Sequence, residues 1–69
     1  MATAGGATVQ WDREKKRWFV EIQVGLEVIK RPFPEKSRQA SVETLQGLAV
    51  AMASDEGYEL DPAHVIVVH

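Results

Sequence analysis

The sequence contains no cysteine, which excludes disulfide bonds, a thiolate nucleophile and a cysteine-rich zinc site. It also lacks an apolar run near the ~20 residues that a membrane-spanning helix needs. Residues 1–6 do not show the basic and apolar stretches of a signal peptide. We therefore expect a cytoplasmic protein that is stabilised by side-chain packing.

At 69 residues the chain is long enough for one hydrophobic core and too short for two. Its hydrophobic fraction of 45% and charged fraction of 26% are typical of a globular chain. Residues 1–6 are small and polar enough to predict a flexible tail, which leaves residues 7–69 as a single domain. Because so small a domain buries only about 60% of the surface of its unfolded chain, we expect it to form a homodimer.

The first half of the chain has the alternating pattern of short strands. Val9 and Trp11 share one face of a strand, and the charged run 12–16 predicts a hairpin loop in solvent. Residues 18–24 alternate most clearly, with Trp18 on the buried face and Phe19 opposite. These patterns predict two antiparallel strands.

A single strand over residues 17–31 would be far longer than the usual five or six residues, so we expect an interruption at Gly25. Glycine readily takes the positive φ that the first central position of a two-residue hairpin turn requires. A turn at Gly25-Leu26 places Ile22 opposite Ile29. One long strand bent at a glycine bulge is the alternative.

Apolar residues recur at spacings of three and four between positions 42 and 52, after a stop at Pro32-Phe33-Pro34, and predict one helix. Ser37 and Ser41 are both possible N-caps, and Gly57 suits the C-terminal end. Gly47 inside the helix costs about 1 kcal/mol relative to alanine, for which close approach of the helix to the sheet is a possible reason.

Residues 64–69 predict the last strand, and its four β-branched residues make both of its faces apolar. The elements together predict an α+β fold in two layers: a three-stranded antiparallel meander, one helix and one final strand, in the order β-β-β-α-β. One helix covers one face of a sheet, so we expect a second copy to cover the other. The candidate interface residues are Phe19, Ile29, Ile66 and Val68.

All eight lysines and arginines lie between positions 13 and 38, close to both tryptophans. Such a cluster can bind phosphates beside aromatic stacking platforms. Five acidic residues reduce the charge of that half from +8 to +3, which is less basic than a typical nucleic-acid-binding domain. Nucleic-acid binding is therefore the alternative to a protein interaction, with candidate contacts at Arg13, Lys15, Lys16 and Arg17.

The remaining polar residues show no catalytic or metal-binding pattern. The acidic run 55–61 lacks the ligand order of a calcium loop. Asp55 and Glu56 lie where the helix dipole disfavours negative charge, which suggests a basic partner across an interface. His64 and His69 are five apart and point to opposite faces of a strand. We expect no enzymatic activity, no cofactor and no metal site.

Three short segments carry a resemblance to a known family: Thr8-Val9-Gln10-Trp11-Asp12, Trp18-Phe19-Val20 and Ala40-Ser41-Val42-Glu43-Thr44-Leu45. They resemble the HicB-type antitoxin domain. The resemblance implies a β-β-β-α-β layout, oligomerisation and binding of a small RNA-cleaving toxin. The chain is also similar to small bacterial domains of unknown function that end like Val67-Val68-His69.

Overall fold

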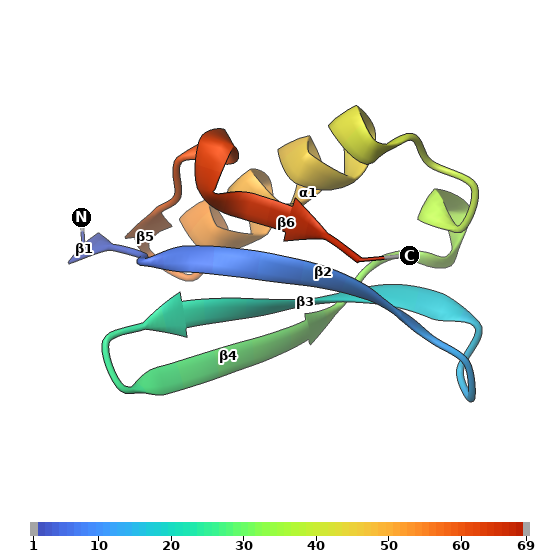
Figure 1. Cartoon of the computed structure of the whole chain (residues 1–69), viewed down its shortest axis with the longest axis horizontal. Coiled ribbons are helices and arrows are strands. Elements are labelled where there is room, and N and C mark those ends of the chain that lie inside the picture. The colour runs from blue at the N-terminus through green and yellow to red at the C-terminus, as the bar shows by residue number, and fades with distance from the viewer. Residues whose placement is uncertain (1, 69) are drawn as a thin grey trace.

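The computed structural model describes residues 2–68 and has an α+β fold, in which an α-helix packs on one face of a four-stranded sheet (Figure 1). The strands and helices are β1 (Ala2–Thr3), β2 (Gly6–Asp12), β3 (Arg17–Val24), β4 (Glu27–Pro32), η1 (Glu35–Ser37), α1 (Val42–Asp55), β5 (Tyr58–Glu59), η2 (Pro62–His64) and β6 (Val65–Val67). The main sheet has the order β4-β3-β2-β6, and β1 pairs with β5 in a small second sheet.

The charged loop joins β2 to β3 in the predicted antiparallel hairpin, with Trp11 opposite Trp18. The Asp12 carboxylate accepts hydrogen bonds from the backbone N–H groups of Glu14 and Lys15, at 3.0 and 3.2 Å. Aspartate at this position folds the chain back on itself, since its side chain replaces a backbone acceptor.

The β3–β4 connection is a two-residue hairpin turn, so the alternative of a single strand with a glycine bulge is wrong. Gly25 has a φ of +60° at the first central position of the turn. Ile22 lies opposite Ile29 and Val24 opposite Glu27, which is the predicted register. The local requirement for a positive φ was therefore enough to identify the turn.

The last strand lies at the edge of the main sheet, parallel to β2, with Ala7 beside Val65 and Val9 beside Val67. Both of its faces are apolar, and the prediction is that α1 covers one and a second copy the other. Val65 is buried, but Ile66 is 63% exposed because only the face toward α1 is covered within the described part of the chain.

The structure differs from the prediction in the first six residues, which we expected to form a flexible tail. Ala2 and Thr3 pair with β5, and the buried Ala4 donates its backbone N–H to Glu59 at 2.8 Å. Gly5 donates to the carbonyl of Gln23, also at 2.8 Å. The small side chains gave no apolar pattern, yet their backbone is hydrogen-bonded to two separate segments. Met1 and His69 lie outside the described residues.

The helix begins and ends at predicted residues. The Ser41 hydroxyl accepts the N–H of Thr44 at 3.2 Å, which makes Ser41 the N-cap, whereas Ser37 lies in η1. Gly57 follows the helix with a φ of +89°. The interpretation of Gly47 was wrong, because a Cβ added there would meet no atom within 4 Å.

The core fills the space between α1 and the inner face of the sheet. The same alternation that placed Trp18 on the buried face brings Val20 and Ile22 against Leu45 and Ala49 of the helix. All four of these aliphatic side chains are fully buried. Within residues 2–68, α1 therefore covers one face of the main sheet and leaves the other face uncovered.

Candidate functional site

The uncovered face of the main sheet, called the outer face below, consists of the residues that alternate with the core residues along each strand. The register places Thr8 beside both Glu21 and Ile66, and Phe19 between Gln10 and Pro32. By alternation it comprises Thr8, Gln10, Asp12, Arg17, Phe19, Glu21, Gln23, Val28, Lys30, Pro32 and Ile66.

Polar groups at the centre of the outer face are largely paired with one another. The Gln10 amide donates to the Glu21 carboxylate at 3.3 Å. The Lys30 ammonium lies 4.4 Å from the centre of the Phe19 ring, a cation–π contact. These two contacts engage the polar groups at the centre of the face. The apolar side chains at its edges remain exposed.

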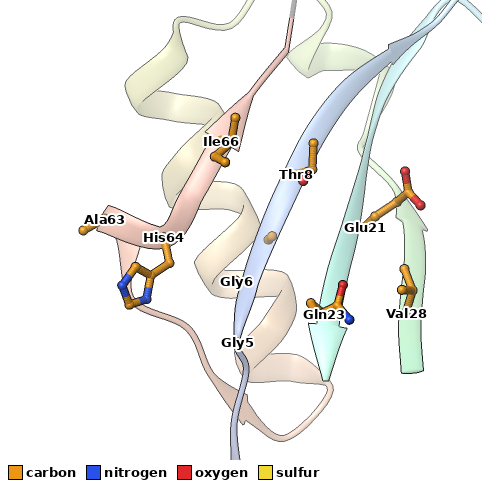
Figure 2. Close-up of a pocket in the computed structure, with 10 residues that line it drawn as sticks. Gly5, Gly6, Thr8, Glu21, Gln23, Val28, Ala63, His64 and Ile66 are labelled. Atoms are coloured by element: carbon orange, nitrogen blue, oxygen red, sulfur yellow. The ribbon is translucent and has the colours of Figure 1, made fainter. Parts of the chain in front are cut away.

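A hollow of about 480 Å³ runs over β2 on this face (Figure 2). Its floor is formed by Gly6, which has no side chain, and by Thr8, whose side chain is small, and Ile66 and Val28 lie on opposite sides (Figure 2). His64 borders the same hollow from η2. The outer face thus combines a recess with apolar side chains at its rim.

Two of the predicted interface residues, Phe19 and Ile66, share the outer face. Val68 follows β6 and is 46% exposed. Ile29 does not belong to this surface, because it lies opposite Ile22 and packs against the core. The predicted hairpin register already implied this placement, since residues directly opposite each other share a face.

Two exposed apolar residues at the β3–β4 turn end of the sheet were not among the predicted interface residues. Val28 lies on the outer face opposite Gln23 and is half exposed. Leu26, at the tip of the β3–β4 turn, is fully exposed. The alternation of β4 could have identified Val28, whereas nothing in the sequence distinguishes Leu26 from an ordinary turn residue.

Three of the four basic residues predicted to contact nucleic acid border two different hollows. Arg13 borders a hollow of about 490 Å³ at the end of β2, together with Trp11 and Arg38. Lys15 and Arg17 border a different hollow of about 270 Å³, beside Phe19. Lys16 lies in the loop with a φ of +53°.

The acidic residues after the helix have partners within the chain. Glu56 accepts a hydrogen bond from Arg31 of β4 at 2.7 Å, so the basic partner expected across an interface is intramolecular. Asp61 accepts the N–H of Ala63 at 2.9 Å and caps η2. Among residues 2–68, no three His, Cys, Asp or Glu side chains gather closely enough to hold a metal ion.

Both edges of the main sheet are partly blocked. On β4, Pro32 has no N–H to donate, and the Arg31 guanidinium donates to the Lys30 carbonyl at 2.9 Å. On β6, the Gln46 amide of α1 donates to the Val65 carbonyl at 3.4 Å. These contacts oppose the addition of a strand at either edge, which leaves the outer face as the larger free surface.

No helix in the described part of the chain is both long and apolar enough to cross a membrane. Comparison with protein-family models, with curated proteins and with solved structures finds no match for this chain. The resemblance to HicB-type antitoxin domains therefore stays a prediction, and function is argued from the residues and their geometry.

Proposed function

We propose that the chain is a non-enzymatic protein-interaction module that forms a homodimer through the outer face of its sheet. The observation that carries the proposal is the exposure of Ile66, the central residue of β6. Its side chain is 63% exposed, and it lies on a sheet face that no described segment covers. Exposed β-branched residues on a sheet face are favourable when a second apolar surface packs on them.

The outer face is suited to a second copy of itself. A two-fold dimer brings the same patch of each copy together, so the patch must supply both a recess and the groups that fill it. The hollow over Gly6 and Thr8 supplies the recess, and Ile66 and Val28 at its rim supply the apolar groups. Glu21 is hydrogen-bonded to Gln10 and lies beside Lys30 in the register, so the central carboxylate has a cation next to it when the face is buried.

The size of the face predicts a weak dimer. The four strands of the face hold 7, 8, 6 and 3 residues, and with a rise of about 3.3 Å per residue and a spacing of about 4.8 Å they give a face of roughly 380 Å². Two such faces bury roughly 800 Å² together, below the ~1,200 Å² at which stable interfaces begin. We therefore expect a dissociation constant in the micromolar range rather than a permanent dimer.

Sedimentation equilibrium between about 5 µM and about 500 µM tests the proposal over this range of affinity. The weight-average mass should rise from the 7.7 kDa of one chain toward twice that value. Ile66→Glu should remain at 7.7 kDa at every concentration, because a carboxylate would lose its water in the interface.

Val42→Glu is the matched control. Val42 is 40% exposed in the first turn of α1, on the other side of the sheet, and a carboxylate is favourable there. This variant should dimerise as the unchanged chain does. A strict monomer at the highest concentration, or equal loss of dimer in both variants, would refute the outer-face dimer.

A further inference from the structure

Among residues 2–68, no strand pairs with one side of the end of β2 that carries Trp11. β6 pairs only with residues 7–9 of β2, whereas β2 continues to Asp12. The hairpin loop and the connection from β4 to α1 lie at this same end of the sheet (Figure 1). The hollow of about 490 Å³ between them, called the tryptophan hollow below, is lined by Gln10, Trp11, Arg13, Trp18, Arg38 and Val68.

The two tryptophans form a fixed aromatic platform in this hollow. Trp18 is buried, and its indole N–H donates to the Arg38 carbonyl at 3.0 Å. The Trp11 ring meets it edge to face, with ring centres 5.4 Å apart and planes at 74°. Because Trp18 is anchored and Trp11 remains 37% exposed, an aromatic surface is held in place without being covered.

The hollow is positively charged. Its described lining contains two guanidinium groups and no carboxylate. Arg13 makes no ion pair with another described residue, and Arg38 approaches Glu35 only at 3.7 Å. The same Glu35 carboxylate lies nearer to Arg17, at 3.4 Å. The charge of Arg13 is therefore available to an anion, whereas Arg38 shares the single Glu35 carboxylate with Arg17.

We propose that the tryptophan hollow binds a short stretch of single-stranded nucleic acid, with a base on Trp11 and phosphates on Arg13 and Arg38. An aromatic ring beside guanidinium groups is the usual combination for unpaired nucleotides. An acidic peptide would occupy the arginines and leave Trp11 without a stacking partner. Of the residues that line this hollow, only Gln10 also belongs to the outer face through which the dimer is proposed.

Two phosphate contacts define the expected salt dependence. A single strand that neutralises two cations has a slope of log K against log salt of about −1.4. Affinity should then fall about sevenfold between about 50 mM and about 200 mM salt. A longer basic track would give a steeper slope, and the net charge of −2 of the chain does not support one.

The test mixes the full chain with a fluorescein-labelled uridine oligonucleotide of about six residues. Binding is measured by the anisotropy of the fluorescein label and by quenching of the tryptophan fluorescence of the chain. The Arg13→Gln/Arg38→Gln double variant should bind at least about tenfold more weakly and lose most of the salt slope. Both guanidinium groups lie at the surface, so the variant should keep the fold and its circular dichroism spectrum.

The single variant Arg13→Gln has Lys30→Gln as its matched control. Each removes one positive charge, but Lys30 lies on the outer face, outside the hollow. Lys30→Gln should leave oligonucleotide binding unchanged. The proposal is wrong if anisotropy does not change at about 50 mM salt, if Lys30→Gln weakens binding as much as Arg13→Gln, or if binding occurs without tryptophan quenching. Equal competition by oligoglutamate or by inorganic phosphate would also overturn it in favour of a general anion site.

Discussion

Replacement of Gly47 by alanine should stabilise the protein, because this glycine serves no packing role. It lies inside α1 and is exposed, and no atom beyond its chain neighbours and the backbone of its own helix lies within 4 Å of the position a Cβ would take. Alanine is favoured over glycine in a helix interior by about 1 kcal/mol, since glycine loses more backbone freedom on folding. For a domain of this size that free energy raises the Tm by about 4–8 °C.

Gly57→Ala is the matched control, because the same methyl group is added where it also meets nothing within 4 Å. Gly57 has a φ of +89°, a left-handed conformation that costs alanine about 1 kcal/mol or more. The two variants should therefore shift the Tm in opposite directions. Thermal unfolding followed by circular dichroism, at one fixed and low protein concentration, separates this effect from dimerisation. A decrease in Tm for Gly47→Ala would refute the reasoning and restore a packing role for this glycine.

Three further changes test local features of the fold by chemical denaturation. Ser41→Ala should cost about 1 kcal/mol because the N-cap of α1 is lost; an unchanged stability would show that the cap contributes nothing. Gly25→Ala should destabilise the protein by about 1 kcal/mol because its φ of +60° is unfavourable for alanine; a neutral effect would contradict the turn. A double-mutant cycle of Arg31→Gln and Glu56→Gln should give a coupling of only about 0.2–1 kcal/mol, because this ion pair is exposed to solvent. That coupling should shrink in high salt, and a salt-independent value above this range would contradict a surface ion pair.

The features that local chemistry determines could be predicted from the sequence. Gly25 requires a positive φ, Ser41 has the side chain of an N-cap, and Asp12 closes a hairpin loop, so each marks its own position in the fold. The alternation around Val20 likewise separates the core from the outer face, because successive side chains in a strand point to opposite sides.

Contacts between distant segments could not be predicted in the same way. Nothing near Glu56 identifies Arg31, 25 positions earlier, as its partner. The place of β6 beside β2 is likewise set by how the helix returns the chain to the sheet. Arg13, Lys15 and Arg17 are close together in the sequence, but Arg13 borders one hollow whereas Lys15 and Arg17 border another.

The role of the outer face is tested most directly by a dilution series of amide NMR spectra. Between about 20 µM and about 500 µM, the signals of Thr8, Gln23 and Ile66 should move with concentration as the dimer forms. Signals from the exposed side of α1, such as those of Glu43 and Ser54, should stay fixed. Concentration-dependent shifts confined to α1, or none at any concentration, would contradict an interaction through the outer face.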